Sequence, residues 1–396
     1  MAKLRYGIIT FKGHPVGTLT ETAAGGTVFE YYNDVPEIAC ALPRSESTHT
    51  YNYGIHPVFA HLAPEGWLRN RQSAIADADV EDDFGLLLAF GADCIGAIGI
   101  EDPDAHGKKF VAKPNIDLET EAITENRRTI SGVQAKILCY QDGHSFVPAS
   151  TNSPASHIAK FAREDLIDIV NNEATTLRLL ETLLPKHQVN TFQTTVISSI
   201  NKPALILKRF DREGPDANIK LRCEDFAQVI AIPPGRRREN KYAVDYTALH
   251  EALKYSEAPK IDALLVLERL IAYAILGNTD CHLKNWSLLE TTNGLRLAPI
   301  YDALNCYIYG EQSYSTEFGL KLGDHAVQWD QVNRETIFEI GKYLKLNKAI
   351  VELTFKQIFK TKEHLFHNLY EPLGLNEHRT AQYRGSVETK WSDFYD

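Results

Sequence analysis

The sequence lacks several features that mark special classes of protein. It has no stretch of about 20 apolar residues. Its first residues, MAKLRYGIITFKGHPVG, are interrupted by charge and glycine before an apolar signal region can form. No internal repeat or low-complexity tract is present in the sequence. From these absences we expect a soluble, cytoplasmic protein that makes no contact with a membrane.

The sequence also lacks a cysteine framework and an excess of positive charge. Its six cysteines include no C-x-x-C pair and show no regular spacing, which fits reduced thiols. The 42 lysines and arginines are outnumbered by 52 aspartates and glutamates, and the net charge of -10 argues against an extended nucleic-acid surface. We interpret Arg236, Arg237 and Arg238 as a solvated loop, with a local nucleic-acid contact as the alternative.

The first hundred residues of this 396-residue chain combine short strands with two helices. Residues 4–11 and 16–20 are β-type runs, and EGWLRNRQSAIADA and DDFGLLLAFGADC have helical character. The acidic, proline-bearing segment near 101–120 has no periodicity and makes a natural boundary. We therefore predict a β-rich N-terminal module at residues 1–105.

Two lobes are predicted after this module. Residues 120–243 form a mixed lobe, with strands in ISGVQAKILCYQ, HSFVPAS, SHIAKFA, QTTVISSI and ALILKRF and a helix in NNEATTLRLLETLL. Residues 244–396 are mainly helical, apart from a hairpin in NWSLLETTNGLRLAPIYD with Asn293-Gly294 as its two-residue turn. The fold class is therefore expected to be α+β, with two lobes and an added β-rich module.

The stretch GNTDCHLKNWSLL carries the chemistry that a phosphoryl-transfer enzyme needs. Asp280 and Asn285 have the D-x-x-x-x-N spacing of a kinase catalytic loop. Asp302 follows seventeen residues after Asn285, at the far end of the predicted hairpin, so the two oxygen ligands should meet around magnesium. Each residue alone also fits a cap or a turn. Their combined spacing favours phosphoryl transfer, in which Asp280 orients the attacking hydroxyl.

Two further residues of this stretch have open roles. His282 can support the loop by hydrogen bonding and is counted with the nucleotide site, without a role in proton transfer. Lys284 can screen phosphate charge or simply lie exposed to solvent.

The mixed lobe is expected to supply a cation for phosphate. Strand alternation places Lys160 on the same face as Ile158, where a lysine needs a charged partner. Glu173, in the next helix, is the candidate partner, and the alternative is a lysine that reaches out from an edge strand.

The segment ALILKRFDRE changes abruptly from apolar to charged. If it joins the two lobes, the backbone at Lys208 and Phe210 can face an adenine ring, and Asp211 can accept from ribose hydroxyls.

These residues resemble the HipA-like serine/threonine kinases of bacterial toxin-antitoxin systems. HPVFAHLAPEGWLR and LLLAFGADCIGAIG look like the N-terminal module of that family, and ISGVQAK, SHIAKF, NNEA, LKRFDR, EDFAQ, GNTDCHLKN and APIYDAL look like its kinase core. The resemblance implies a two-lobed protein-kinase-like fold, ATP and Mg²⁺ as cofactors, and a protein substrate. It also implies that Asp280 acts on the substrate hydroxyl, that Asn285 and Asp302 hold magnesium, and that Lys160 binds the ATP phosphates.

The resemblance further implies a phosphorylated residue in the nucleotide loop, just before Gly132 of the G-x-Q-x-K motif. Thr129 and Ser131 are the two candidates for autophosphorylation. A phosphate there could move the loop toward solvent or pair with Arg127 or Arg128, which would block ATP. The single glycine of the loop, and Thr279 in place of the arginine of H-R-D, depart from eukaryotic protein kinases and suit the bacterial family.

Members of this family act with a small helix-turn-helix antitoxin of the HipB type, and some phosphorylate aminoacyl-tRNA synthetases or affect translation in other ways. The acidic net charge predicts that DNA is reached only through such a partner. Two alternatives are a small-molecule kinase of the aminoglycoside or choline type and a catalytically silent partner of a repressor.

Overall fold

The computed structural model describes residues 4–104, 117–130, 132, 134–163, 165–235, 238–310 and 313–396. The predictions for Ser131, Arg236 and Arg237 therefore lie outside the described residues. By its internal contacts the chain forms two compact units, and the bounds of the three expected parts stay a prediction. Unit 1 is Met1–Phe161 with Thr195–Pro234, and unit 2 is Ala162–Thr194 with Gly235–Asp396.

The first sheet of unit 1 is an antiparallel sheet of neighbouring strands in the order β4-β3-β2-β1-β5. The strands are β1 (Tyr6–Phe11), β2 (His14–Glu21), β3 (Thr27–Tyr31), β4 (Thr48–Tyr51) and β5 (Ile98–Glu101). Lys12 and Gly13 both have positive φ, 52° and 81°, as a tight two-residue hairpin turn requires. Ile9, Leu19 and Phe29 are fully buried and join this sheet to α1 (Pro57–Ala60) and α3 (Asp83–Phe90) in one core.

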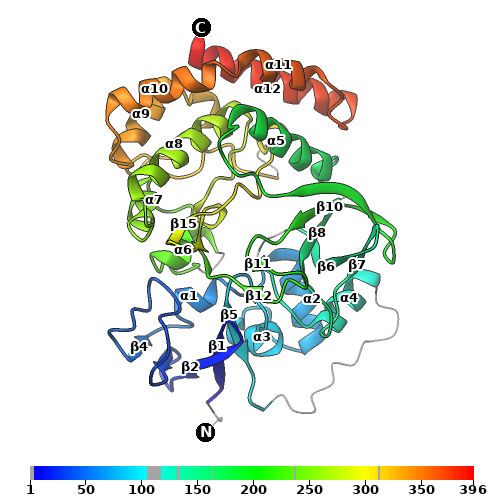
Figure 1. The fold of residues 1–396 in the computed structure, drawn as a ribbon, viewed down its shortest axis with the longest axis vertical. Helices are drawn as coiled ribbons and strands as arrows, with labels where there is room; N and C mark the ends of the chain where they lie inside the picture. The colour runs from blue at the N-terminus through cyan, green and yellow to red at the C-terminus, as the bar shows by residue number, and fades with distance from the viewer. Residues whose placement is uncertain are drawn as a thin grey trace. The chain divides into compact units, whose positions relative to one another are not determined.

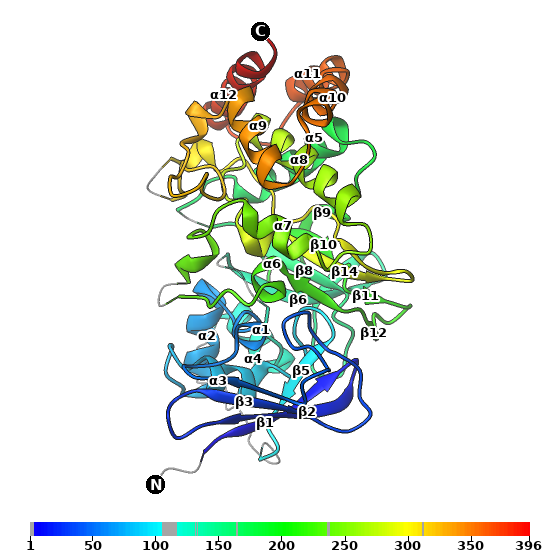
Figure 2. The ribbon, with the colours of Figure 1, turned by 90° about the vertical axis from the view of Figure 1, so that its left-hand side faces the viewer.

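The second sheet of unit 1 has the order β7-β6-β8-β10-β9. Its strands are β6 (Lys136–Asp142), β7 (Ser145–Pro148), β8 (His157–Phe161), β9 (Phe192–Ile197) and β10 (Lys202–Lys208). Helices α2 (Gly66–Ala76) and α4 (Leu118–Asn126) contribute apolar side chains to its core. Figure 2 shows α2, α3 and α4 between the strands β1 to β3 and the strands β6 and β8. The short elements β11 (Arg212–Glu213), β12 (Ile219–Lys220), β13 (Cys223–Asp225) and α6 (Phe226–Val229) complete the unit.

Unit 2 is built around α8 (Pro259–Ile275), most of whose residues are buried. Its other main helices are α5 (Ile169–Leu183), α7 (Thr247–Leu253), α9 (Arg334–Tyr343), α10 (Lys348–Phe359), α11 (Lys362–Tyr370) and α12 (Glu377–Tyr395). Figure 1 shows α9 to α12, in orange and red, alongside α8 and α5. The strands β14 (Ser287–Thr291) and β15 (Gly294–Leu297) form the expected hairpin.

Several predicted elements are confirmed, and some details differ. Thr291 pairs with Gly294, so the two-residue turn of the hairpin is Thr292-Asn293, one position earlier than predicted. Helices α4, α11 and α12 were not predicted, because their apolar residues are few and are interspersed with charge. Among the described helices, none combines the length and the apolarity needed to cross a membrane.

Asp262 anchors the hairpin to the first turn of α8. This side chain has no exposed surface and accepts from Arg296 Nη2 at 2.8 Å and from the Leu297 amide at 3.0 Å, both on β15. The hydroxyl of Ser256 also donates to it. A charge-assisted network of this kind therefore connects the hairpin, which lies between Asn285 and Asp302, to the largely buried helix α8.

We expect Asp262→Ala to lower the free energy of unfolding of the protein by about 3 kcal/mol, because it leaves several buried donors without an acceptor. Urea unfolding measures this change. Asp330→Ala, which lies at the surface of the same unit, serves as the control and should leave the midpoint nearly unchanged. An equal loss in both variants would contradict the anchoring role.

Candidate active site

The segment that carries Asp280 starts where α8 ends. Gly277 has a φ of 73°, and a Cβ atom at this position would lie 2.4 Å from Oδ1 of Asn305. Glycine is therefore required both by the left-handed conformation and by the close side chain. The polar run first seen in the sequence is thus a loop that leaves a buried helix through a glycine turn.

Backbone hydrogen bonds hold this loop in place. The Thr279 carbonyl accepts from the Gly319 amide at 3.0 Å, and the Thr279 hydroxyl donates to the Ser315 carbonyl at 2.7 Å. The indole of Trp286 donates to the Cys281 carbonyl at 3.2 Å. Thr279, at the position of the H-R-D arginine, therefore orients the loop through neutral hydrogen bonds instead of charge.

The side chain of Asn285 is oriented by the same loop. Its Nδ2 donates to the Asp280 carbonyl, which assigns the amide so that Oδ1 is the end that can coordinate a cation. Asn285 is 8% exposed, so the amide is held within the structure rather than in solvent. This orientation fits a hard divalent ion such as magnesium, which takes oxygen ligands.

Asp302 lies in a strained backbone conformation with a φ of 53°. The residue before it, Tyr301, donates its hydroxyl to the Lys284 carbonyl at 2.9 Å, and Ser287 Oγ lies 2.6 Å from the same hydroxyl. Lys284 directly precedes Asn285, so one hydrogen bond joins the neighbours of both predicted cation ligands. A non-glycine residue with positive φ is often found where function requires a particular side-chain direction.

The segment after Asp302 is fastened to α5. Asn172 exchanges two hydrogen bonds with the backbone of Asn305, at 2.8 and 3.0 Å, and neither side chain is exposed. Asn172 precedes Glu173, which is 1% exposed. The helix predicted at NNEA therefore positions the segment after Asp302 through Asn172.

Acidic side chains of unit 2 raise the pKa values of the same neighbouring residues. Burial, followed by the negative charges of Asp280 and Asp302, raises the pKa of the Cys306 thiol well above its usual value. Burial also raises the pKa of Tyr314, and the charges of Asp280, Asp302 and Glu173 add to this effect. These carboxylates therefore act on common neighbours, as residues around one cation site should.

The donor set suits magnesium better than zinc. Within the described part of the chain, no group of three or more His, Cys, Asp and Glu side chains could hold a metal ion. Magnesium in phosphoryl-transfer sites needs only one or two carboxylates, with phosphate and water oxygens completing its shell. One aspartate and one oriented asparagine amide fit this requirement.

Tyr242 makes a contact with Asp280 that the sequence did not suggest. The Tyr242 hydroxyl donates to Oδ1 of Asp280 at 2.5 Å. His282 Nε2 lies 3.8 Å from the same oxygen, and the rings of Tyr242 and His282 meet edge to face with centroids 4.7 Å apart. His282 thus belongs to the surroundings of Asp280, while its predicted nucleotide contact stays a prediction.

In unit 1, the structure pairs Lys160 with a second lysine. Lys160 on β8 lies opposite Lys136 on β6, and each is 5% exposed. The side chains of Ala159 and Phe161 point into the core with α2 and α4, so alternation directs Lys160 to the other face of the sheet. A Cβ atom on Gly132 would lie 2.0 Å from Nζ of Lys136, which brings the nucleotide-loop glycine next to this lysine.

The segment ALILKRFDRE does not join the units. The chain passes between them after Phe161, Thr194 and Pro234, and residues 204–213 lie wholly within unit 1. Lys208 is exposed at the end of β10, and Phe210 is half-buried. Their predicted backbone contacts with adenine stay predictions.

Asp211 is a structural residue in this arrangement. It is 2% exposed and accepts from Arg209 Nη2 at 2.8 Å, from Arg212 Nη1 at 2.7 Å and from the Gly96 amide at 2.7 Å. Although burial opposes ionisation, the two arginines hold the pKa of Asp211 below its usual value. A carboxylate engaged in this way has no exposed oxygen for a ribose, so the geometry does not favour the predicted contact.

Two other predictions concern buried side chains. Thr129 is 1% exposed, and its hydroxyl lacks a hydrogen-bond partner among the described residues. Glu173 belongs to unit 2 and Lys160 to unit 1, so their predicted pairing stays a prediction.

Three residues near the proposed sites were not predicted from the sequence, and the sequence pattern indicated them to different degrees. Lys136 was visible as the last residue of the G-x-Q-x-K motif. Tyr301 directly precedes Asp302, but a hydroxyl bonded to a carbonyl seventeen positions away leaves no trace in sequence spacing. Tyr242 lies 38 positions before Asp280, which places their contact beyond any local pattern.

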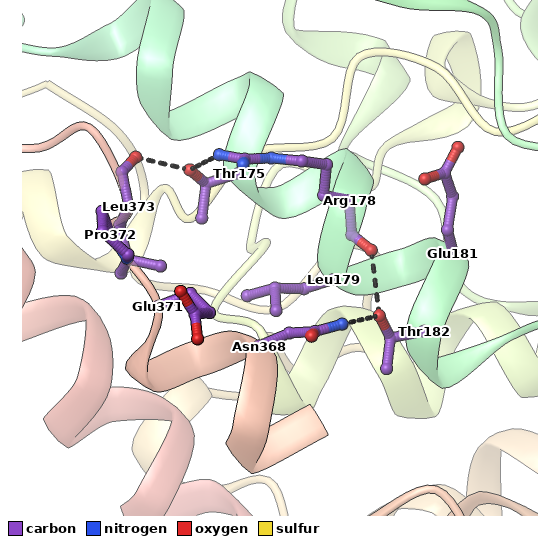
Figure 3. A pocket seen from close by; sticks show the side chains of 9 residues that line it. All are labelled: Thr175, Arg178, Leu179, Glu181, Thr182, Asn368, Glu371, Pro372 and Leu373. Carbon is purple, nitrogen blue, oxygen red and sulfur yellow. Dashed lines mark hydrogen bonds between the residues drawn. The ribbon is translucent and has the colours of Figure 1, made fainter. Parts of the chain in front are cut away.

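A separate cavity of about 390 Å³ lies between α5 and the end of α11. Figure 3 shows Leu179 and Thr182 on one side and Asn368, Pro372 and Leu373 on the other. Asn368 donates to the Thr182 hydroxyl at 2.8 Å across it. None of the predicted site residues lines this cavity.

Comparison with known proteins identifies two matching family models. The HipA-like C-terminal domain matches residues 128–366, and the HipA N-terminal domain matches residues 8–101. Among curated proteins, the chain is 28% identical over 337 residues to "Putative kinase Y4dM" of Sinorhizobium fredii, covering 77% of this chain and 79% of that protein. It is 22% identical over 271 residues to the serine/threonine-protein kinase toxin HipA of Shewanella oneidensis, covering 61% and 60% of the two chains.

A solved structure has the same overall fold. It is the Shewanella oneidensis HipA in complex with HipB and operator DNA, with a TM-score of 0.73 over 98% of this chain and 97% of that one. The match supports the expected two-lobed kinase-like α+β fold. Because the sequence identity is only 18%, it does not assign roles to the site residues.

We expect Tyr301→Phe to weaken the binding of Mn²⁺, used as a magnesium probe, by about 10-fold, because residues that orient metal ligands typically contribute this much. Electron paramagnetic resonance of the full-length protein with a non-hydrolysable ATP analogue measures the affinity. Tyr32→Phe, at an exposed position, is the matched control. Equal Mn²⁺ affinity in the wild type and in Tyr301→Phe would show that the hydroxyl does not set the ligand geometry.

Proposed function

Because the chain belongs to the HipA family, we propose that it is a serine/threonine protein kinase that transfers the γ-phosphate of ATP to a hydroxyl of another protein. The observation that carries this proposal is the arrangement in unit 2. The Asn285 side chain donates to the Asp280 carbonyl, and the Tyr301 hydroxyl joins the residue before Asp302 to the residue before Asn285. Asp280 and Asn285 also have the spacing of a kinase catalytic loop.

In the proposed reaction, Asp280 accepts a hydrogen bond from the acceptor hydroxyl. As the hydroxyl oxygen forms its bond to the γ-phosphorus, the bond from that phosphorus to the ADP oxygen breaks, and the proton passes to the Asp280 carboxylate. Asn285 Oδ1 and the Asp302 carboxylate would hold magnesium, which when bound neutralises charge on the phosphates. The protein contributes to catalysis mainly because the loop positions these groups.

Lys136 and Lys160 are the proposed phosphate-binding cations. They lie opposite each other on adjacent strands, so a phosphate group that approaches this face could accept hydrogen bonds from both ammonium groups. Their low exposure strengthens this attraction, because the surroundings screen charge less than water does. Gly132, which leaves room for the Lys136 ammonium, would allow the nucleotide loop to come close to the same phosphates.

Autophosphorylation at Thr129 or Ser131 is proposed as regulation of this nucleotide site. The buried Thr129 hydroxyl has no room for a dianion in its present surroundings, so a phosphate on it would require the loop to leave this position. A displaced loop would remove Gly132 from Lys136 and would hinder ATP binding.

We further propose a toxin-antitoxin role for the protein. The similar Shewanella oneidensis protein is named a toxin and is found with HipB and operator DNA. By analogy, a small HipB-type antitoxin would be the partner here, and the net charge of -10 assigns any DNA contact to that partner. An aminoacyl-tRNA synthetase or another translation component is the proposed substrate class. The six cysteines are buried and none forms a disulfide in the described part of the chain, which fits the proposed cytoplasmic location.

We expect Asp280→Gln to reduce phosphoryl transfer by about 100-fold or more, as is typical when a positioned general base is removed. The full-length protein is incubated with Mg²⁺ and labelled ATP, and phosphopeptides are mapped by mass spectrometry. Label on Thr129 or Ser131 in the wild type, absent from the variant, agrees with the proposal. Failure of the wild-type protein to bind ATP would refute it, and label transferred only to aminoglycosides or choline would favour the small-molecule alternative.

We expect Lys136→Met and Lys160→Met each to weaken ATP binding by about 10-fold, because each removes one charge-assisted contact with phosphate. Isothermal titration with ATP and Mg²⁺ measures the affinity. Lys208→Met is the matched control, since Lys208 is proposed to contact the nucleotide through its backbone alone. An unchanged affinity in Lys136→Met would remove that residue from the site.

A further inference from the structure

The Tyr242 hydroxyl occupies one oxygen of Asp280, the carboxylate proposed to receive the acceptor hydroxyl. It donates to Asp280 Oδ1 at 2.5 Å, and the Asp280 side chain is 22% exposed. A serine or threonine that is about to be phosphorylated must present the same group, an O–H, to the same carboxylate. The phenol therefore makes, from within the chain, the hydrogen bond expected of the acceptor.

We propose that Tyr242 occupies the acceptor-hydroxyl position of Asp280 in the resting protein and must withdraw before a substrate is phosphorylated. This inference rests on the proposed kinase function and deepens it by defining the acceptor site. In the resting state the phenol keeps both water and unsuitable hydroxyls away from Asp280 Oδ1. A correct protein substrate displaces it with its own hydroxyl.

Asp280 does not need Tyr242 for its position. The loop around it is held by the Gly319 amide on the Thr279 carbonyl and by the Asn285 side chain on the Asp280 carbonyl. Both contacts involve backbone atoms and are independent of the phenol. Loss of the Tyr242 hydroxyl should therefore expose the carboxylate without displacing the loop.

Tyr242 also lies on a segment that can move without unfolding a helix. It follows Glu239–Lys241, a 3₁₀ helix of one turn. The described backbone hydrogen bonds of this turn are local, and one of them joins the Tyr242 amide to the Glu239 carbonyl at 2.9 Å. The chain becomes anchored just beyond it, where the Lys321 amide donates to the Val244 carbonyl at 3.1 Å and the Tyr246 amide donates to the Lys321 carbonyl at 3.2 Å. Rotation near Ala243 would remove the phenol and leave this anchor in place.

The hydrogen bond to Asp280 and two ring contacts hold the phenol in its resting position. Its ring meets the His282 ring edge to face, with centroids 4.7 Å apart, and Lys241 Nζ lies 5.5 Å from its centroid. Tyr242 is half-buried, so part of the residue already contacts solvent. His282 would remain as one wall of the acceptor site after Tyr242 has withdrawn.

The test compares wild type, Tyr242→Phe and the matched control Tyr53→Phe, a tyrosine that is 83% exposed in unit 1. Two acceptors are used with the full-length protein, ATP and Mg²⁺. The first is water, measured as ATP hydrolysis, and the second is a synthetic peptide with the sequence of residues 124–137. We expect Tyr242→Phe to raise ATP hydrolysis several-fold and to lower the KM for the peptide by about 10-fold, with kcat within about twofold of wild type.

If Tyr242 instead orients Asp280, the substitution should change kcat and leave KM nearly unchanged. In that case Tyr242→Phe would lower kcat, with little change in the KM for the peptide and no gain in hydrolysis, and this result would overturn the inference. Addition of Asp280→Gln to Tyr242→Phe should abolish the extra hydrolysis. If neither the wild type nor Tyr242→Phe shows turnover that depends on Asp280, the kinase proposal itself fails, so the two failures are distinguishable.

Discussion

The hydrogen bond from the Tyr301 hydroxyl to the Lys284 carbonyl is the contact on which the geometry of the proposed site depends. It closes the β14–β15 hairpin at its open end, and its two partners are the immediate neighbours of Asp302 and Asn285. Asp262 holds the same hairpin on α8 through Arg296. Because magnesium tolerates little deviation from octahedral geometry, two ligands from distant positions can serve it only if their separation is set in this way.

Unit 1 contains two different arrangements of buried charged side chains. Arg209 and Arg212 pair with the carboxylates of Asp211 and Asp93, and the cluster joins residues 209–212 to the turn at Asp93–Gly96. On the second sheet, Lys136 and Lys160 bring two positive charges together on one face. The first arrangement stabilises the fold, whereas the second is the one proposed to bind the phosphates of ATP.

Predictions from the sequence were most accurate where the pattern is local. The strand predicted in SHIAKFA is β8, and the mainly helical region predicted at residues 244–396 includes α8, because both patterns depend on residues a few positions apart. The hairpin was found, although its turn lies one position earlier than its Asn-Gly pair suggested. The ribose contact predicted for Asp211 is not favoured, since a charged residue after a strand looks the same whether its partners are ligands or two nearby arginines.

The sequence by itself determined the family resemblance, the α+β class and the order of Asp280, Asn285 and Asp302, because spacing along the chain encodes these directly. Only the tertiary structure decided that Lys136 faces Lys160, that Asn172 holds the Asp302 segment, and that Tyr242 reaches Asp280. Each of these contacts joins residues far apart in the chain. Their proximity depends on how helices and sheets pack, and packing is a property of the whole fold that no local pattern contains.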